Sequence, residues 1–261
     1  MHAQAVIFDL DDTIIVEESF ARASLRAAVA GAGLNIDDVD GLDSALLEGI
    51  RRVWRSGPFI DICTLLGIAS WEGLWASFDG GHPMLDGLRQ WVPTYRVEAW
   101  RVALEELGVD DPDIAVSVAD AYVQTQRQGH PLIPGAAETI RTLAEQVPLG
   151  LLTNGPPDIQ RFKLERTGLG GCFTTIGISG ELGVGKPSRA AFAYMLDALR
   201  VGGADAVMIG DSWERDVEGA LNMGLDAVWI SSDTSRLRDP RVAAIESVGD
   251  VKSALEHLGR R

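Results

Sequence analysis

Cysteine and histidine are scarce in this sequence, and neither forms a cluster. The two cysteines, Cys63 and Cys172, lie far apart and match no CxxC or Cys/His zinc pattern. The four histidines are equally scattered, at His2, His82, His130 and His257. These absences give no support to a zinc site or a histidine-based mechanism, and they favour a reduced, intracellular chain.

Long apolar runs and net positive charge are also missing. No apolar stretch reaches the roughly 20 residues of a membrane helix, and no positively charged segment with an apolar run precedes the first predicted strand. The 23 lysines and arginines against 38 acidic residues give a formal net charge of −15, so the average surface repels nucleic acid and anionic membranes. We therefore expect a cytoplasmic protein whose partners are neither nucleic acid polymers nor membranes. Its oligomeric state, monomer or homodimer, stays open.

Two common enzyme motifs are absent or incomplete. The sequence contains no GxSxG nucleophile elbow. Residues 180–186 (GELGVGK) match most of a Walker A loop, but the next residue is Pro187. A Walker A loop needs Ser or Thr there to hold Mg²⁺, and proline has neither a hydroxyl nor an N–H. We therefore do not expect an ATPase, and we expect these glycines to shape the approach of Lys186.

The chain does contain enough apolar residues, 46%, for a sizeable core. Five short apolar runs are typical of strands that are buried on both faces, and they lie at residues 5–8, 149–152, 175–178, 206–209 and 227–230. Segments of helical period separate the later runs, at residues 158–167, 188–199 and 214–223. Strict alternation of strand and helix predicts an α/β fold with a Rossmann-like parallel sheet.

Residues 19–128 differ, because their periodicity is helical throughout and no convincing strand occurs. Breaks are expected at Gly57-Pro58, Pro83, Pro93 and Pro112. Five of the seven tryptophans fall in this region, and at helical spacing we expect most of them to be packing residues. We predict two domains, a core of residues 1–15 and 134–261 and an inserted all-helical domain of residues 16–133.

Polar clusters stand at the expected carboxyl ends of three strands. The first strand is followed by residues 9–13 (DLDDT), the second by residues 153–155 (TNG) and the fourth by residues 210–216 (GDSWERD). Lys186, followed by Pro187, stands just before the helix that leads into the fourth strand. In an open parallel sheet, ligands bind beyond the carboxyl ends of the strands, near the point where strand order reverses. We therefore expect all four clusters to converge on one crevice.

These four clusters, in this order, resemble the motifs of the haloacid dehalogenase (HAD) superfamily of phosphohydrolases. The motifs are hhhhDxDxT, hhhT/SN, a lysine before proline, and GDSxxxD, and the likeness covers the whole chain. The helical insert resembles the C1-type cap of that superfamily. The DLDDT form of the first motif also resembles pyrimidine 5′-nucleotidases and N-acylneuraminate-9-phosphatases, which favours a nucleoside monophosphate or a sugar phosphate as substrate.

The resemblance implies Mg²⁺-dependent hydrolysis of a small phosphomonoester, a small phosphorylated metabolite being the partner. Asp9 would be the nucleophile that forms an aspartyl-phosphate, Asp11 the general acid and base, and Lys186 the group that neutralises phosphoryl charge. The groups that bind the phosphoryl oxygens would come from Leu10, Asp11, Thr153, Asn154, Gly155 and Lys186. The metal site would be built from Asp9, Asp11 (through its carbonyl), Asp211 and, in the near shell, Asp216.

Elementary electrostatics agrees with a cation at this place. Each pair of carboxylates about 5 Å apart costs roughly 3 kcal/mol at an effective dielectric constant of 20. A divalent cation offsets that repulsion. Mg²⁺ is hard, prefers oxygen ligands, and is typically bound by one or two carboxylates together with phosphate and water.

Three alternatives stay open at this point. A haloacid dehalogenase would use Asp9 on carbon but needs neither an acid at Asp11 nor a metal, so Asp11 argues against it. A phosphomutase would keep every core motif and return the phosphate to an intermediate. A non-catalytic binding protein on the same fold has no need for charged groups at Asp9, Asp11, Lys186 and Asp211, which destabilise an empty site.

The insert and the first turn offer further expectations. Arg51 and Arg55 share a helix face at i, i+4, and in an acidic protein this favours surface ion pairs. Glu17 is expected near the opening of the crevice because it follows the first motif closely. Residues 77–83 have the composition of a flexible loop. Asp12 stands where the superfamily often has glycine, and we expect it to serve an unusual turn of the backbone.

Overall fold

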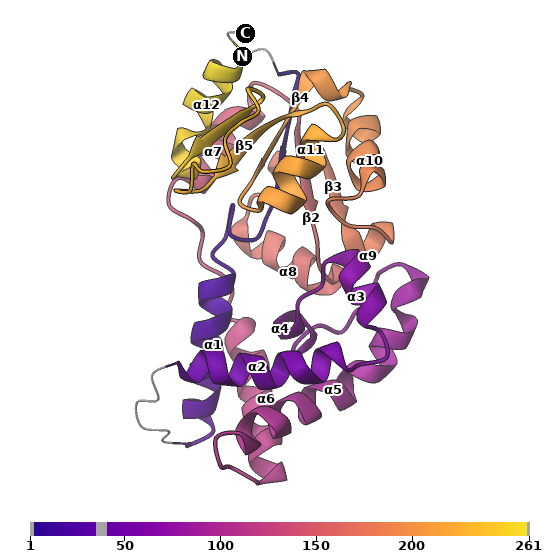
Figure 1. Cartoon of the computed structure of the whole chain (residues 1–261), viewed down its shortest axis with the longest axis vertical. Helices are drawn as coiled ribbons and strands as arrows, with labels where there is room; N and C mark the ends of the chain where they lie inside the picture. Colours follow the sequence, from indigo (N-terminus) through magenta and orange to yellow (C-terminus); the bar gives the residue numbers. More distant parts are fainter. Residues whose placement is uncertain (1–2, 35–40, 260–261) are drawn as a thin grey trace.

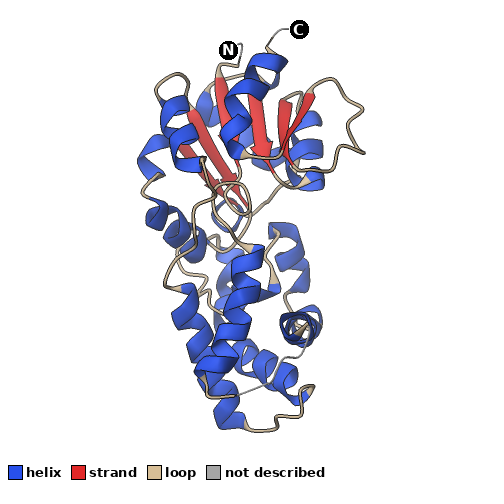
Figure 2. Cartoon of the chain, turned by 90° about the vertical axis from the view of Figure 1, so that its left-hand side faces the viewer, coloured by secondary structure: helices blue, strands red, loops and turns tan. Residues whose placement is uncertain are grey.

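The computed structural model describes residues 3–34 and 41–259, which divide between a sheet-based part and a helical part (Figure 1). Figure 2 shows the strands gathered toward one end of the molecule and helices alone at the other. Within the described residues, no helix combines the length and hydropathy of a membrane-spanning segment.

Six parallel strands form one sheet in the order β3-β2-β1-β4-β5-β6. Their bounds are Ala5–Phe8 (β1), Leu149–Thr153 (β2), Thr175–Ile178 (β3), Ala206–Gly210 (β4), Asp226–Ile230 (β5) and Val242–Ile245 (β6). The order reverses at β1, which lies between β2 and β4, so the first motif stands at the switch point. The predicted strands are confirmed as β1 to β5. The edge strand β6 is not among them, because two of its four residues are alanines, which strands disfavour.

Helices cover both faces of the sheet. They are α7 (Ala136–Ala144), α8 (Pro157–Thr167), α9 (Ser179–Leu182), α10 (Arg189–Leu199), α11 (Gly219–Leu221) and α12 (Val251–Leu258). Side chains alternate across β1, so Val6 and Phe8 join one apolar cluster with α7 and α12, whereas Ala5 and Ile7 join another with α10 and α11. All four side chains are fully buried. The α/β class with a Rossmann-like parallel sheet is therefore confirmed.

The helical insert has an apolar core, which Ile159 of α8 joins from the sheet-based part. Its helices are α1 (Glu18–Gly31), α2 (Leu42–Arg55), α3 (Ile60–Leu66), α4 (Ser70–Gly73), α5 (Asp86–Glu105) and α6 (Pro112–Gln126). Helices α2 and α5 cross closely at Gly49, where a Cβ atom would lie 2.8 Å from the Ala103 Cα. Trp54, Trp75 and Trp100 are buried in this core, as the helical spacing predicts.

The break expected at Pro93 does not occur. Helix α5 runs through this residue without interruption. Pro93 lies on the exposed face of the helix, where the carbonyl group that loses its N–H partner remains open to water. The prediction that proline ends the helix at this position is therefore wrong.

Two chain segments join the insert to the sheet-based part, and they run side by side. The Val16 N–H donates to the Pro131 carbonyl at 2.8 Å, and the Ile133 N–H donates to the Ile14 carbonyl at 2.9 Å. An antiparallel bridge between Ile15 and Leu132 completes the pairing. We call this short ribbon, residues 14–17 and 130–133, the paired linker.

The helix predicted for residues 214–223 has a different form. It begins as a π-helical turn, η4 (Trp213–Glu218), and continues as the short helix α11. The wider turn brings the Asp216 carboxylate back to the end of β4, where its Oδ2 accepts from the Ser212 N–H at 3.0 Å. Such turns occur frequently at functional sites.

Candidate active site

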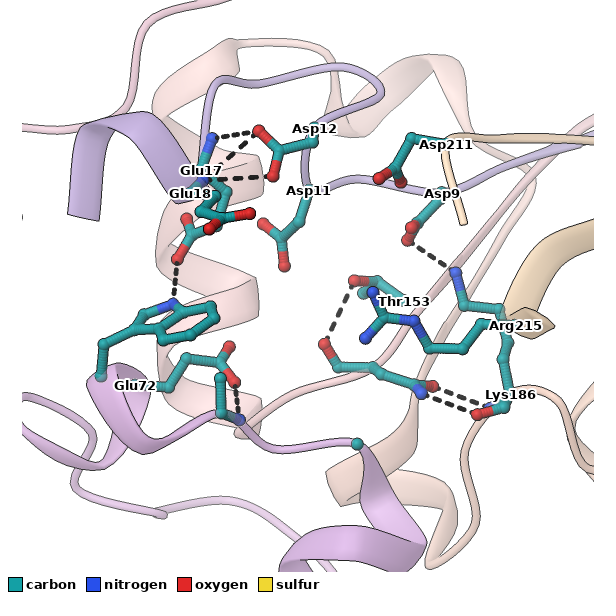
Figure 3. A pocket seen from close by; sticks show the side chains of 14 residues that line it. Asp9, Asp11, Asp12, Glu17, Glu18, Glu72, Thr153, Lys186, Asp211 and Arg215 are labelled. Carbon is teal, nitrogen blue, oxygen red and sulfur yellow. Dashed lines mark hydrogen bonds and ion pairs between the residues drawn. The ribbon is translucent and has the colours of Figure 1, made fainter. Parts of the chain in front are cut away.

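Asp9 stands directly after β1, at the edge of the sheet where β1, β2 and β4 end (Figure 3). Its side chain is buried, and its Oδ1 accepts from the Leu10 N–H at 2.7 Å and lies 2.7 Å from Lys186 Nζ. Burial raises the pKa of Asp9 to about 8; Lys186 opposes this shift, while Asp216 and Asp211 add to it. A cation bound beside Asp9 would act in the same direction as Lys186.

Asp211 and Asp216 complete a three-carboxylate cluster with Asp9. Oxygens of the three side chains lie within 4.8 Å of one another. Burial raises the pKa of Asp211 to about 6, and the charge of Asp216 adds to the shift. Both Asp216 oxygens are engaged, one by Lys186 Nζ at 2.7 Å and one by the Ser212 N–H. Asp9 and Asp211 are therefore the better placed carboxylates for binding a cation, and Asp216 holds the lysine.

Lys186 reaches this cluster because the second motif clamps its backbone. Asn154 Oδ1 accepts from the Lys186 N–H at 2.8 Å, and Asn154 Nδ2 donates to the Lys186 carbonyl at 2.9 Å. A Cβ atom at Gly185 would lie 2.7 Å from Asn154 Oδ1, so the close approach requires glycine. Of the three glycines in the Walker A-like sequence, Gly185 therefore shapes the approach of Lys186.

Several of the predicted phosphate-binding groups already have partners within the protein, among them the Leu10 N–H, which donates to Asp9 Oδ1. The Asn154 side chain holds Lys186, and the Gly155 N–H donates to Ser179 Oγ at 2.9 Å. The Thr153 hydroxyl faces the pocket, where its Oγ1 accepts from Gln160 Nε2 at 2.6 Å. We therefore expect the phosphate contacts to come mainly from Thr153 and Lys186.

Asp11 is held from helix α8 by two side chains one turn apart. Gln160 Nε2 donates to Asp11 Oδ2 at 2.9 Å, and Lys163 Nζ lies 3.0 Å from Asp11 Oδ1. Neither residue is among the predicted site residues. A lysine on a predicted helix is ordinarily taken for a solvated one, and only the i, i+3 spacing of these two polar residues hinted at a shared face.

Lys163 also contacts carboxylates outside the sheet-based part. Its Nζ lies 2.8 Å from Glu17 Oε2 and 3.8 Å from Glu72 Oε1. Burial alone would raise the pKa of Glu17, but Lys163 and His130 more than offset this and hold it at about 2. His130 Nε2 lies 3.0 Å from Glu17 Oε2, while His2 lies outside the described residues. Within the described chain, no histidine joins the Asp9 cluster.

Asp12 serves the turn, as expected. Its φ of 52° is in the left-handed region, which aspartate tolerates better than most residues. Its Oδ1 accepts from the Glu17 N–H at 2.9 Å and its Oδ2 from the Glu18 N–H at 3.1 Å, so it caps the start of α1. The third carboxylate of the first motif is therefore structural.

One pocket of about 160 Å³ lies between the sheet edge and the insert. From the motifs and the linker, its lining includes Asp9, Asp11, Asp12, Glu17, Thr153, Asn154, Lys186 and Asp211. The insert contributes Gly67, Ala69, Trp71 and Glu72, and Trp71 Nε1 donates to Glu17 Oε1 at 3.1 Å. The pocket lining also includes Arg215, which is labelled in Figure 3. Glu17 lines the pocket, but its side chain is buried against Lys163 and His130 and is not shown at an opening. Trp71 and Arg215 are not among the predicted site residues.

The insert docks on the sheet-based part through the loop that was expected to be flexible. Ser77 and Phe78 donate their N–H groups to the Asp158 carboxylate at 2.6 and 3.0 Å. The His82 N–H donates to the Gly180 carbonyl at 2.8 Å. The composition of residues 77–83 predicts a flexible loop, but the loop is held by partners that lie far away in the sequence and cannot be identified from the local residues.

The arginines of α2 follow two patterns. Arg52 and Arg55 form surface ion pairs with Glu106 and Glu48, the latter at 3.3 Å, as expected for an acidic protein. Arg51 instead lies over the Trp71 ring, 5.9 Å from its centroid. Its side chain is therefore next to a residue of the pocket wall.

Glu72 gives a testable dependence of stability on pH. Burial raises its pKa to about 8, since Lys163 is 3.8 Å away and already serves two nearer carboxylates. The folded state therefore binds a proton more tightly than the unfolded state, and this contribution to stability is lost as pH rises from about 5 toward 8. At about 1.4 kcal/mol per pKa unit, we expect a loss of a few kcal/mol.

The measurement is the free energy of unfolding against pH, in EDTA, for wild type and Glu72→Gln. Glutamine keeps an oxygen for the Ala69 N–H, which Glu72 Oε2 binds at 2.8 Å, but has no charge. The wild type should lose more stability than the variant between pH 5 and 9. Parallel curves for the two proteins would contradict the assignment.

Known proteins of similar sequence include a protein family and several curated relatives. The sequence matches the haloacid dehalogenase-like hydrolase family over residues 3–224. Phosphoserine phosphatase from Thermus thermophilus is 34% identical over 248 residues, which cover 95% of this chain and 96% of that protein. Pyrimidine 5′-nucleotidase YjjG from Escherichia coli is 31% identical over 140 residues, 52% of this chain and 58% of that protein, so the match spans about half of each.

The fold has a counterpart among solved structures. The crystal structure of the putative HAD-hydrolase YfnB from Bacillus subtilis, bound to magnesium, matches with a TM-score of 0.68 at 22% identity. The match covers 98% of this chain and 100% of that one, so it includes both the sheet and the helical insert. The family match meanwhile spans all four motifs. The chain therefore belongs to the haloacid dehalogenase-like hydrolases.

Proposed function

We propose that the protein is a phosphatase that hydrolyses a small phosphomonoester through an aspartyl-phosphate on Asp9, with Mg²⁺ as cofactor. The observation that carries the proposal is the buried Asp9 carboxylate at the switch point of the sheet, with Lys186 Nζ at 2.7 Å and Asp211 and Asp216 beside it. A relative that matches nearly the whole chain is named for phosphatase activity, which supports this reaction class.

The donor set suits a hard divalent cation. Asp9 and Asp211 offer carboxylate oxygens, Asp11 offers its carbonyl, and all available donors are oxygens. Burial, together with the charge of Asp216, raises the pKa values of Asp9 and Asp211, and a bound cation would act in the opposite direction by favouring the charged carboxylates. Mg²⁺, when bound, would supply positive charge for the phosphoryl oxygens. Asp216 supports the site indirectly, because it holds Lys186.

The chain's own residues account for the two transfers. An Asp9 oxygen attacks phosphorus while the bond to the leaving oxygen breaks, and Asp11 gives that oxygen a proton. Water then attacks the aspartyl-phosphate, Asp11 takes its proton, and phosphate leaves with Asp9 regenerated. Lys186 and the Thr153 hydroxyl stabilise the charge on the transferred group.

The helical insert is, in this proposal, a cap on the catalytic core. The core would comprise residues 1–15 and 134–261 and the cap residues 16–133, joined by the paired linker. Because the cap supplies Trp71 and Glu72 to the pocket wall, it would exclude bulk water and select the leaving group. Large polymers and phosphoproteins would then be poor substrates.

The size of the pocket favours a small leaving group. About 160 Å³ is below the 300–1,000 Å³ typical of sites for larger ligands. The phosphoserine phosphatase match extends over the insert, whereas the nucleotidase match covers about half of the chain. We therefore place phosphoserine and small sugar phosphates ahead of nucleoside monophosphates.

A substrate panel tests this proposal. Phosphate release would be measured from phosphoserine, sugar phosphates and nucleoside monophosphates, each with Mg²⁺ or with EDTA. We expect release that requires Mg²⁺ and is fastest for small leaving groups. Activity that persists in EDTA would overturn the metal proposal, and no release from any compound would favour a phosphomutase or a binding protein.

A further inference from the structure

Helix α8 carries two residues that contact the Asp11 carboxylate. Gln160 and Lys163 lie one turn apart and bind the two oxygens of Asp11 separately, at 2.9 and 3.0 Å. The Lys163 side chain is fully buried, and the Gln160 residue is 1% exposed. Lys163 is therefore not a solvated surface lysine, and its position next to Asp11 requires an explanation.

Lys163 keeps its charge in this place. Burial would lower its pKa, but Asp11, Glu17 and Glu72 raise it above the ordinary value. Its nearest partner is Glu17 Oε2 at 2.8 Å, which is closer than Asp11. One ammonium group is therefore shared between the first motif and the start of the insert.

Glu17 contacts residues of both the linker and the helical insert. It lies in the paired linker, and His130 of the opposite linker strand is 3.0 Å from its Oε2. Its Oε1 accepts from Trp71 Nε1 of helix α4. A continuous chain of polar contacts thus runs from the insert through Glu17 and Lys163 to Asp11.

We propose that Lys163 is a positioning residue that orients Asp11 and ties this orientation to the seating of the cap. The inference rests on the proposed function, in which Asp11 handles protons. Both Asp11 oxygens accept N–H donors here, one from Gln160 and one from Lys163, and these two contacts fix the direction in which the carboxylate faces. Lys163 therefore serves chiefly the second step, in which Asp11 activates water against the aspartyl-phosphate.

The alternative is that Lys163 only neutralises buried carboxylates. The two roles differ in which chemical step they affect. Lost neutralisation lowers stability, and through it both steps together. Lost orientation slows hydrolysis of the aspartyl-phosphate but spares transfer from p-nitrophenyl phosphate, whose leaving group needs no proton.

The experiment is stopped-flow release of nitrophenolate from p-nitrophenyl phosphate with saturating Mg²⁺. For Lys163→Met we expect steady-state turnover to fall about 100-fold, the effect of misplacing a catalytic group. The first turnover should stay within about threefold of wild type, so that a burst of one nitrophenolate per chain appears. Lys163→Arg, which keeps the charge, should recover most of the steady-state rate.

Two further variants keep the test decisive if Lys163→Met fails to fold. Gln160→Met removes the other contact to Asp11 and should also slow the second step, by about tenfold. Glu17→Gln leaves Asp11 itself untouched but weakens the link to the linker, and it should slow the same step. These two variants separate the contact with Asp11 from the coupling to the cap.

The outcomes separate the inference from the proposed function. Equal losses in burst and steady state, or no loss in any variant, would overturn the role of Lys163 while leaving the phosphatase intact. A normal second step in Glu17→Gln would overturn the coupling to the cap. If wild type releases no nitrophenolate, or releases it without Asp9, the proposed function itself fails.

Discussion

Replacement of Asp9 by asparagine is expected to lower phosphate release by roughly 10⁴-fold or more. The amide has the shape of the carboxylate but cannot attack phosphorus, and two neighbouring carboxylates are committed elsewhere. Asp216 has both oxygens engaged, and Asp12 caps α1. The measurement is phosphate release from the best substrate of the panel, with Mg²⁺ present.

Stability provides the control for this variant. Asp9 is buried with a raised pKa, so the neutral amide should leave the unfolding temperature unchanged or higher. Asp197→Asn, an exposed change on α10, should retain full activity. A folded Asp9→Asn protein with more than about a tenth of wild-type activity would exclude Asp9 as the nucleophile.

The second large effect is expected for Asp11→Asn, and it should depend on the leaving group. With an alkyl phosphate such as phosphoserine, both steps need Asp11, and turnover should fall by roughly 10²–10⁴-fold. With p-nitrophenyl phosphate, the first step needs no proton, so only hydrolysis of the aspartyl-phosphate should be slow. A burst of nitrophenolate followed by slow turnover is the expected signature.

The comparison between the two substrates provides the internal control. Loss of folding or of metal binding would lower the first turnover for both compounds alike. An Asp11→Asn protein that hydrolyses phosphoserine at more than about a tenth of the wild-type rate would show that another group handles the protons. Lys163→Met should show a milder form of the same phenotype.

The local sequence predicts most of the sheet, because a short run of apolar residues marks each buried strand. The apolar runs that form β1, β2 and β4 are buried at every position, and this pattern is local and strong. Those of β3 and β5 include partly exposed residues. The exceptions depend on surroundings. Pro93 is tolerated because it faces solvent, and the π turn η4 forms where Asp216 must return to the end of β4.

Within the candidate site, residues at strand ends could be predicted, whereas residues on helices could not. Asp9, Thr153 and Asp211 follow parallel strands, and the sheet itself brings such positions together. Lys163 meets Asp11 from 152 positions away in the sequence, and a lysine within a helical pattern gives no local signal of burial. Glu17 and Trp71 likewise meet only when the insert has folded against the linker.

Some residues predicted to bind phosphate make contacts within the protein instead. Asn154 and Gly155 occupy the expected place, but the Asn154 amide fixes the backbone of Lys186. A motif identifies which residues gather at a site. It does not state which of them face the ligand, because that depends on donors and acceptors contributed by distant segments.

Trapping the phosphoryl group tests the central proposal most directly. Asp11→Asn would be mixed with p-nitrophenyl phosphate and Mg²⁺, quenched in acid, digested and analysed by mass spectrometry. The account predicts one phosphoryl group per chain on the peptide that contains Asp9, removed by hydroxylamine as an acyl phosphate, and none when Asp9→Asn is added to the variant. A phosphoryl group on another residue, or none despite nitrophenolate release, would contradict it.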